Sequence, residues 1–286
     1  MPVSFLMLFG LVVIAALWSC NAAHPGEARY PGAHSVGRRQ DGRRRIPRYD
    51  QRGRGPAPRC NPSARLSSRR RRRRTDLADV KVSMAGLQIK IISVNSAISM
   101  MTGPTNCVVV WRKGVSVVVD PGGEGAKIAR FLRRKKLTVG AYWLTHGHPD
   151  HVGGLPQLLE EFPAPVKYHK ADSGWIKVTL PLLSLRRSEW FDPYGAIRKI
   201  VCGDIVAKVI MTPGHSHGSV CYWLDEAGVL LSGDTLMQGC VGATIYPGGD
   251  SSRLVNSLRK IFNRIPVDVK VLPGHGVCTM IGTEGC

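Results

Sequence analysis

The segment that most constrains this chain spans residues 145–151, where three histidines and one aspartate fall within six positions. An apolar run (residues 141–144) that reads as a buried strand precedes it, and a helix-like segment (Leu155–Glu161) follows it. Because side chains at i and i+2 of an extended backbone point to one side, His146 and His148 are expected to bind one metal ion. Asp150 and His151 lie beyond the turn and suit a second ion. Imidazole combined with carboxylate favours zinc, iron or manganese over calcium or magnesium.

Three later junctions supply further candidate ligands. His215, Asp234 and His275 each follow an apolar run that is rich in β-branched residues (Ile205–Met211, residues 229–231 and residues 267–272). Each stands beside a glycine, which lets the backbone turn sharply. Of the seven histidines outside the N-terminal region, five occupy such junctions or the first motif. This concentration at strand ends argues against ordinary core packing.

In this order the candidate ligands resemble the metallo-β-lactamase superfamily, and most closely its glyoxalase II (hydroxyacylglutathione hydrolase) branch of the compact single-domain type. The resemblance covers about residues 82–285. It also rests on smaller pieces, which are Asn106-Cys107, Val119-Asp120-Pro121-Gly122-Gly123, Gly218-Ser219-Val220, Tyr246-Pro247-Gly248-Gly249-Asp250 and the tail from Pro273 to Glu284. The implied fold class is α/β, a four-layer αββα sandwich with the metals at one edge of its two sheets.

The resemblance implies a ligand for every coordination role. Metal 1 would be held by His146, His148 and His215, and metal 2 by Asp150, His151 and His275. Asp234 would bridge the two divalent ions, for which zinc is expected, with iron and manganese as alternatives. Asp120 matches an acid that orients a ligand imidazole in the family, and a simple turn-forming role before Pro-Gly is an equally open reading.

The expected reaction is metal-assisted hydrolysis, in which a metal-bound hydroxide attacks a thioester or ester carbonyl of a small molecule. Asp150 is the candidate catalytic residue, because it can accept the proton of the nucleophile. The resemblance points to S-(hydroxyacyl)glutathione as substrate. A mononuclear iron sulfur dioxygenase of the same fold and a lactone or other ester hydrolase are the alternatives, whereas Asp234 argues against β-lactam cleavage.

Three departures from the branch limit the substrate prediction. The sequence ends eleven residues after His275, so the helical C-terminal domain that supplies much of the glutathione site in full-length glyoxalase II enzymes is not expected. Ala243 and Ile245 stand where the branch usually has Arg and Asp, which weakens the case for an anionic thiol. His217 replaces a Pro or small residue, and we expect it to face solvent rather than substrate.

The first 75 residues differ in composition from the rest. They hold seventeen arginines, no lysine and three acids, so about +14 of the net charge of +20 comes from this quarter. Residues 1–23 are expected to be a signal-like apolar segment, residues 24–75 an Arg-rich disordered transit or pro-segment, and residues 76–286 the hydrolase domain. Import into a plastid-like organelle through the secretory pathway is the predicted destination, with secretion as the alternative.

The same segment bears on partners. The apolar run is too short for a comfortable membrane span, so none is expected in the mature protein. Six consecutive arginines at residues 69–74 favour targeting over nucleic-acid binding, because no aromatic residues alternate with them to stack on bases. Nucleic acid is therefore not an expected partner, and the sequence leaves the oligomeric state open.

Four further features of the domain either allow two interpretations or are expected to have only a structural role. Residues 175–196 form either a helix and loop that line a hydrophobic substrate pocket or a packed surface helix. His169 is expected to be structural or a pocket wall, because the ligand set is complete without it. The eight cysteines form no CxxC pair, and their spacing predicts no disulfide framework. Cys240, six residues after Asp234, is only a weak candidate to approach the site.

Overall fold

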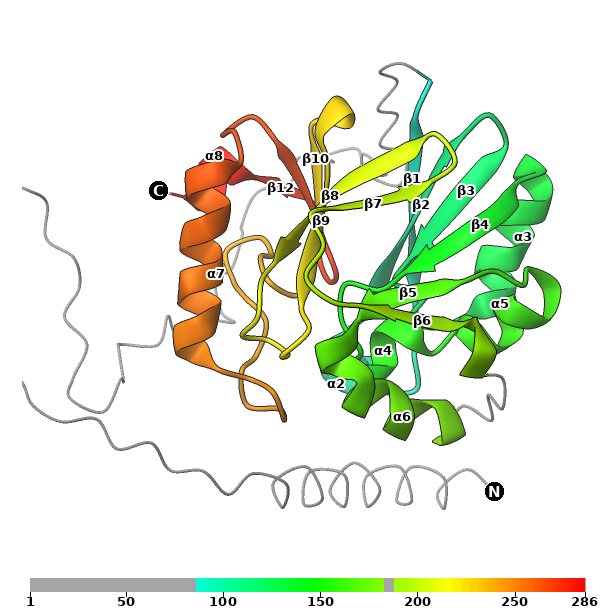
Figure 1. Cartoon of the computed structure of the whole chain (residues 1–286), viewed down its shortest axis with the longest axis horizontal. Helices are drawn as coiled ribbons and strands as arrows, with labels where there is room; N and C mark the ends of the chain where they lie inside the picture. The colour runs from blue at the N-terminus through cyan, green and yellow to red at the C-terminus, as the bar shows by residue number, and fades with distance from the viewer. Residues whose placement is uncertain (1–85, 183–187, 286) are drawn as a thin grey trace, which may run out of the picture. The chain divides into compact units, whose positions relative to one another are not determined.

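The computed structural model describes residues 86–182 and 188–285, and these form two six-stranded sheets with helices outside them (Figure 1). The signal-like and Arg-rich segments expected in residues 1–75 lie outside the described residues, and the domain boundaries proposed for them stay predictions. Across the described residues, no helix combines the length and apolar character needed to cross a membrane.

The first sheet has the strand order β1-β2-β3-β4-β5-β6. β1, β2 and β3 pair in antiparallel fashion, and β3 to β6 pair in parallel. Its strands are β1 (Gln88–Val94), β2 (Thr105–Arg112), β3 (Val115–Val119), β4 (Thr138–Trp143), β5 (Val166–His169) and β6 (Phe191–Tyr194). Helices α3 (Gly125–Lys135) and α5 (Leu155–Glu161) flank this sheet, on the right in Figure 1.

The second sheet has the order β12-β11-β10-β9-β8-β7 and is antiparallel except for the β10–β11 pair. Its strands are β7 (Lys199–Cys202), β8 (Ile205–Met211), β9 (Val220–Leu224), β10 (Val229–Gly233), β11 (Lys270–Pro273) and β12 (Thr279–Met280). Helices α7 (Ser251–Arg264) and α8 (Ile281–Glu284) lie on its outer side, on the left in Figure 1.

Strand β2 shows why the sheets stack in this way. Val108 and Val110 point into the core between the two sheets, whereas Cys107 and Val109 point into the core beneath α3 and α5. Successive side chains of a strand point to opposite faces, so an apolar strand such as β2 is buried on both sides. A third core lies between the second sheet and α7. The four-layer αββα sandwich expected from the sequence is confirmed.

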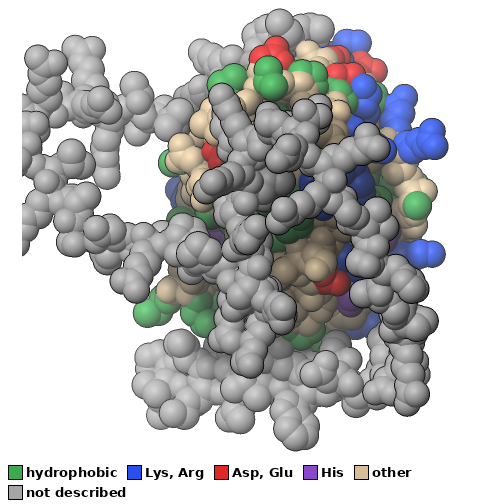
Figure 2. Space-filling view, turned by 90° about the vertical axis from the view of Figure 1, so that its left-hand side faces the viewer, with side chains coloured by type: hydrophobic (Ala, Val, Ile, Leu, Met, Phe, Trp, Pro, Cys, Tyr) green, Lys and Arg blue, Asp and Glu red, His purple; other side chains and the backbone are tan. Residues whose placement is uncertain are grey.

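The two long helices follow from their sequence patterns. In α3, Ile128 and Leu132 are fully buried, and the arginines and lysines between the apolar positions are exposed. In α7, the side chain of Asp250 accepts a hydrogen bond of 2.9 Å from the amide of Arg253 and so caps the helix. On the face shown in Figure 2, Lys and Arg side chains lie mainly at the upper right, with acidic side chains beside them at the top. This mixture of charges is typical of a solvated surface.

The strands β4, β8, β10 and β11 and the helix α5 were predicted from the sequence, and the differences from the prediction have local causes. The strand expected over residues 267–272 begins only at Lys270, because the amide of Val269 bonds the carbonyl of Pro266 and closes a turn. β6, β7 and β12 were not expected. β6 carries Pro193, which has no amide hydrogen to donate. An edge strand such as β6 tolerates this, because one of its sides has no partner strand. No disulfide joins the five cysteines in the part of the chain that the structure describes.

The topology brings four strand ends together. β3 and β4 run in parallel, as do β10 and β11, so that each pair delivers its following loops to one edge of its sheet. The segment 145–151 follows β4, and the loops that carry the later candidate ligands follow β8, β10 and β11. The candidate ligands therefore meet where the edges of the two sheets face each other.

Candidate metal centre

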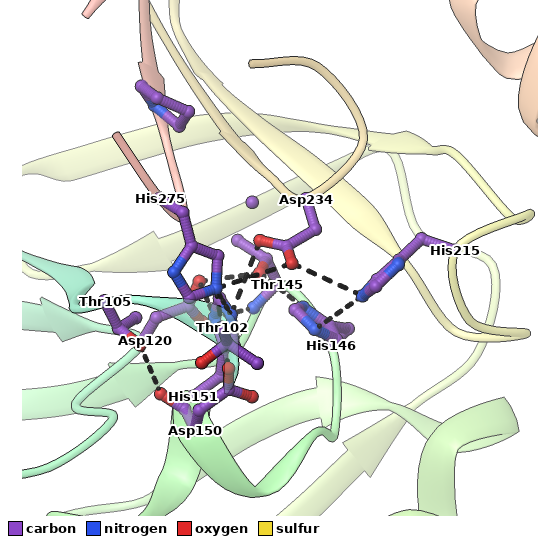
Figure 3. A network of polar contacts seen from close by, with 12 residues as sticks. Thr102, Thr105, Asp120, Thr145, His146, Asp150, His151, His215, Asp234 and His275 are labelled. Atoms are coloured by element: carbon purple, nitrogen blue, oxygen red, sulfur yellow. Dashed lines mark hydrogen bonds and ion pairs between the residues drawn. The ribbon is translucent and has the colours of Figure 1, made fainter. Parts of the chain in front are cut away.

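All seven side chains singled out as ligands gather at this edge. Figure 3 labels all of them except His148. His146 lies in the loop after β4, His148 precedes the short helix α4 (Pro149–Val152), and Asp150 and His151 lie on that helix. Their nitrogen and oxygen atoms form three groups in which all ligand atoms lie within 4.8 Å of one another. The groups are His146 with His148 and His215, His146 with His151 and Asp234, and Asp150 with His151 and His275.

The first group consists of three buried imidazoles. Nε2 of His146 lies 3.2 Å from Nε2 of His215. The ring of His148 lies 4.6 Å from the ring of His146 and 4.5 Å from that of His215, measured between centroids. His146 and His148 therefore do face the same side of the chain, as extended backbone requires.

The group of Asp150, His151 and His275 combines two imidazoles with a carboxylate and is called the second ligand group below. Nε2 of His151 lies 3.3 Å from Nε2 of His275, and Oδ2 of Asp150 lies 3.5 Å from the same His275 nitrogen. Asp234 stands between the groups. Its Oδ2 is 3.5 Å from Nε2 of both His215 and His275, and its Oδ1 is 3.4 Å from Nε2 of His151.

Hydrogen bonds on the far side of the rings fix the direction of their lone pairs. Nδ1 of His215 lies 2.7 Å from the carbonyl oxygen of Ala243, and Nδ1 of His275 lies 3.0 Å from that of Pro104. A carbonyl can only accept, so both Nδ1 atoms carry the proton, and in the neutral rings Nε2 is a bare acceptor. The ring nitrogens that face into the cluster are therefore free to bind a cation.

The cluster fits divalent metal ions on its own geometry. Two imidazole nitrogens that each bind a tetrahedral zinc at about 2.0–2.1 Å lie about 3.3–3.4 Å apart, close to the separations of 3.2 Å and 3.3 Å seen here. Oδ1 of Asp234 is buried and has no hydrogen-bond partner in the described structure. A buried carboxylate oxygen without a donor, aimed at acceptor nitrogens, is stabilised by a cation.

Asp120 braces the loop that carries the first ligands. Its Oδ1 accepts a hydrogen bond of 2.8 Å from the amide of Thr145, and its Oδ2 accepts one of 2.6 Å from the hydroxyl of Thr145. Oγ1 of Thr145 in turn lies 3.1 Å from Nδ1 of His146, and Asp120 Oδ2 lies 3.0 Å from Nδ1 of His151. The backbone of Asp120 is also left-handed, with φ 49°, so this residue both forms the turn and orients two imidazoles.

Asp172 is a functional residue that sequence reasoning missed. This buried carboxylate accepts hydrogen bonds from the amide of Gly147 (2.9 Å), the hydroxyl of Ser216 (2.7 Å) and the amide of Gly218 (2.6 Å). It thereby joins the loop that holds His146 and His148 to the loop that holds His215. Gly147, between His146 and His148, and Gly218, three residues after His215, are the sequence signal that could have pointed to a shared acceptor.

Two glycines leave the space that the ligands fill. A Cβ at Gly274 would lie 2.2 Å from Oδ1 of Asp234 and 2.8 Å from Cε1 of His151. A Cβ at Gly242 would lie 2.4 Å from the carbonyl oxygen of Asp234 and 2.7 Å from Nδ1 of His215. Glycine is required at these positions because the backbone approaches the ligands closely.

The electrostatic surroundings shift the pKa values of the ligand histidines in opposite directions. Burial holds the pKa of His146 well below its usual value and lowers that of His148 to about 3, and the neighbouring imidazoles add to the effect on His146. Burial opposes protonation of His151 as well, but the carboxylates of Asp234 and Asp120 outweigh it and raise the pKa of His151 well above the usual value. The negative field that attracts a proton here also favours a bound cation.

Other singled-out residues take lesser places. His217 is exposed, as expected, and lies against the backbone of Gly248. His169 is buried away from the ligand groups, and its Nδ1 accepts a hydrogen bond from the amide of Ala171. Cys240 is exposed.

The segment 175–196 begins in a helix, as both readings expected, and ends in a strand, which neither reading predicted. Helix α6 (Ser173–Leu182) places the ring of Trp175 at 4.6 Å from the ring of His148, with its Nε1 donating to the carbonyl of Pro247. The ring of Tyr246 lies 5.7 Å from that of His148. The later residues form β6 and pack in the sheet. Residues 183–187 lie outside the described part.

Comparison with known proteins agrees with this geometry. The family described as Metallo-beta-lactamase superfamily matches residues 100–275. Probable metallo-hydrolase YqgX of Bacillus subtilis is 34% identical over 179 residues, which cover 59% of this chain and 83% of that protein. Hydroxyacylglutathione hydrolase GloC of Haemophilus influenzae is 30% identical over 190 residues, covering 63% and 89%. The crystal structure of the BLEG-1 B3 metallo-beta-lactamase is similar with a TM-score of 0.58 and 31% identity, covering 69% of this chain and 96% of that one.

Proposed function

The chain belongs to the metallo-beta-lactamase superfamily, and from this premise we propose that it is a dinuclear metal-dependent hydrolase that cleaves a thioester or ester carbonyl. The observation that carries the proposal is Asp234, whose two carboxylate oxygens lie 3.4–3.5 Å from imidazole nitrogens of both the first and the second ligand group. A carboxylate in this position is suited to bridge two cations. We assign metal 1 to His146, His148 and His215, and metal 2 to Asp150, His151 and His275.

Each part of the site has a proposed task. Bound divalent ions would acidify a water molecule and polarise the carbonyl oxygen of the substrate. Asp150 would accept the proton of the attacking water, because its carboxylate belongs to the second ligand group, with Oδ2 3.5 Å from Nε2 of His275. Asp120 and Thr145 hold the imidazoles of His146 and His151 in the orientation that the reaction needs.

The proposed reaction balances without any further reagent. Water adds its oxygen to the acyl carbon, the bond from that carbon to sulfur or oxygen breaks, and the leaving thiol or alcohol takes up a proton. The products are a carboxylate and a free thiol or alcohol. GloC supports a thioester such as S-(hydroxyacyl)glutathione, because its name states hydrolysis of hydroxyacylglutathione.

Two other reactions remain as alternatives within the same fold. The BLEG-1 structure is titled a B3 metallo-beta-lactamase, so a β-lactam belongs among the tested substrates. A mononuclear iron sulfur dioxygenase would need only one of the ion sites and would consume oxygen with glutathione persulfide. The second ligand group of Asp150, His151 and His275 favours the dinuclear hydrolase.

A substrate panel tests the proposal directly. The protein loaded with zinc, iron or manganese would be assayed with S-lactoylglutathione, short acyl-thioesters, lactones and a β-lactam. We expect turnover of at least one thioester or ester, about two metal ions per chain, and loss of both metal and turnover in Asp234→Asn. Asp225→Asn, an exposed acid paired with Lys208, is the matched control and should retain both. Oxygen uptake with one iron per chain and no hydrolysis would overturn the proposal.

The destination of the protein is a separate proposal. We propose that residues 1–75 direct import into a plastid-like organelle by way of the secretory pathway, because an apolar signal-like run precedes an Arg-rich, acid-poor stretch. A fluorescent fusion of these residues tests it. Fluorescence confined to an organelle would support import, and fluorescence in the medium would support secretion.

A further inference from the structure

Five segments around the metal cluster lack cationic side chains. Residues 76–286 contain 23 lysines and arginines, yet none falls in these five segments, whereas Lys170 and Lys177 lie in the stretch that also carries Asp172 and Trp175. These segments are residues 95–106, 144–154, 212–219, 234–250 and 274–280. An anionic thiol such as glutathione carries carboxylates, which proteins bind chiefly with arginine and lysine. The site offers such a substrate no basic partner on these loops.

The same loops instead expose large apolar side chains. Met100 and Met101 on helix α2 (Ser99–Thr102) are 95% and 81% exposed, and Ile245 is 83% exposed. Val241 and Val277 are also exposed. Single exposed apolar side chains are common on protein surfaces, but several on the loops around one site form a candidate surface for an apolar ligand.

Contacts place all three loops at the mouth of the cluster. The chain after α2 touches the second ligand group. The hydroxyl of Thr105 donates a hydrogen bond of 2.8 Å to the carbonyl of Asp150 (Figure 3). The carbonyl of Pro104 accepts a hydrogen bond from Nδ1 of His275. Val277 follows His275 by two residues, and the carbonyl of Gly276 between them accepts a hydrogen bond from Asn106.

The loop with Ile245 borders the other ligand group. The amide of Gly242 donates to the carbonyl of Asp234, and the carbonyl of Ala243 accepts from His215. Tyr246, the next residue after Ile245, has its ring near that of His148, where Trp175 also lies. Apolar and aromatic side chains thus flank both ligand groups.

We propose that the substrate of this site carries an extended apolar acyl chain on an uncharged or weakly charged leaving group, and that the exposed apolar side chains of the three loops bind that chain. This inference rests on the proposed hydrolase function and specifies its substrate class. Met100 and Met101 suit a chain of variable shape, because methionine is flexible and polarisable.

A chain-length series tests the proposal. The substrates are N-acetylcysteamine thioesters with acyl chains of two, six and ten carbons, assayed with the metal-loaded full chain beside S-lactoylglutathione. Full burial of a methylene group strengthens binding about fourfold. Partial contact with the exposed side chains of the three loops should strengthen binding by about half of that factor, or about twofold, for each added carbon. We expect kcat/KM to rise more than about tenfold from the acetyl to the decanoyl thioester, and S-lactoylglutathione to rank below the decanoyl thioester.

Variants at exposed positions assign the effect to the rim. Ile245→Asp should lower kcat/KM for the decanoyl thioester about fivefold or more and leave that for the acetyl thioester unchanged, with Met101→Gln acting in the same direction. Val255→Asp is the matched control, because Val255 is exposed on α7 and lies outside the five segments that surround the site. A ketone analogue of the decanoyl thioester, in which methylene replaces the sulfur, should bind Ile245→Asp more weakly than the wild type. Isothermal titration calorimetry would measure this, and the loss of affinity should parallel the loss of kcat/KM.

The outcomes separate this inference from the function on which it rests. Equal kcat/KM across the series, or a preference for S-lactoylglutathione, would overturn the apolar substrate class while leaving the hydrolase intact. The absence of any thioester or ester hydrolysis would overturn the proposed function itself. A response of Val255→Asp equal to that of Ile245→Asp would remove the assignment to the rim.

Discussion

The carboxylate of Asp172 accepts a hydrogen bond of 2.9 Å from the amide of Gly147, the residue between His146 and His148. Two further hydrogen bonds, from Ser216 and Gly218, tie the same carboxylate to the loop of His215. One buried acid therefore sets the relative position of the two loops that form the first ligand group. Burial raises its pKa despite these donors.

Asp172→Asn should therefore loosen the first ligand group. An amide would turn an N–H toward one of the backbone donors and leave it unsatisfied, which costs about 1–3 kcal/mol. We expect a lower thermal midpoint and weaker binding of one of two metal ions, measured by differential scanning calorimetry and competitive chelation. Asp192→Asn removes an exposed ion pair with Lys167 and should change stability by less than about 1 kcal/mol. An unchanged metal affinity in Asp172→Asn would remove the proposed positioning role.

Thr145→Val tests the brace between Asp120 and His146. The substitution keeps the size of the side chain but removes the hydroxyl that donates to Asp120 and faces Nδ1 of His146. Loss of such a support typically weakens metal binding about 10–100-fold. Thr138→Val, at an exposed position of β4, is the control and should bind metal like the wild type. Equal affinities in both variants would contradict the brace.

Gly274→Ala should damage the site through shape alone. The added methyl group would lie 2.2 Å from Oδ1 of Asp234, which cannot move without losing its contact with His151. We expect metal content to fall well below that of the wild type in elemental analysis. Gly174→Ala is the matched control, because nothing lies within 4 Å of its added methyl group and alanine favours the helix α6. Full metal content in Gly274→Ala would show that the ligands can rearrange.

The metal-free protein should be most stable near pH 6.5. The pKa of His151 is raised by Asp234 and Asp120, and that of His275 by Asp150 and Asp234, in both cases against the effect of burial. Their contribution is complete below the unfolded pKa of about 6.5 and is lost as the pH rises through the folded values. Burial lowers the pKa of His146 and His148, so their neutral forms favour folding only as the pH rises towards about 6.5.

Metal should invert the alkaline limb of this profile. A bound ion requires deprotonated imidazoles, so its affinity grows as protons leave His151 and His275. The thermal midpoint between pH 6.5 and 8 should fall for protein stripped with chelator and rise for protein loaded with zinc, measured by differential scanning fluorimetry. Parallel slopes in the two preparations would contradict the assignment of these histidines as ligands.

Local pattern allowed the ligand loops to be predicted. His215, Asp234 and His275 each follow an apolar run that had to be a buried strand, and a shared sheet edge brings such strand ends together. The four layers were expected from the family resemblance, and the structure shows β2 apolar on both faces, as a strand between two layers requires. The separation of His146 and His148 from Asp150 and His151 was predicted from the local pattern. Only the resemblance assigned His215, Asp234 and His275 to particular ions.

Asp172 could not be predicted because its partners are backbone amides from distant loops. Its own segment, Lys170–Asp172, reads as an ordinary polar turn before a helix. β6 was hidden by its composition, Phe-Asp-Pro-Tyr, and its pairing with β5 depends on the sheet already being formed. The placement of Trp175 against His148 likewise depends on tertiary packing, because nothing in the spacing of α6 distinguishes a surface helix from a pocket wall.

The most direct test of the account is anomalous X-ray diffraction from crystals of the metal-loaded protein. The account predicts two anomalous peaks about 3.5–4 Å apart, with Asp234 between them. One peak would lie within bonding distance of His146, His148 and His215, and the other of Asp150, His151 and His275. A single peak, or metal bound elsewhere while these seven side chains hold no ion, would contradict it.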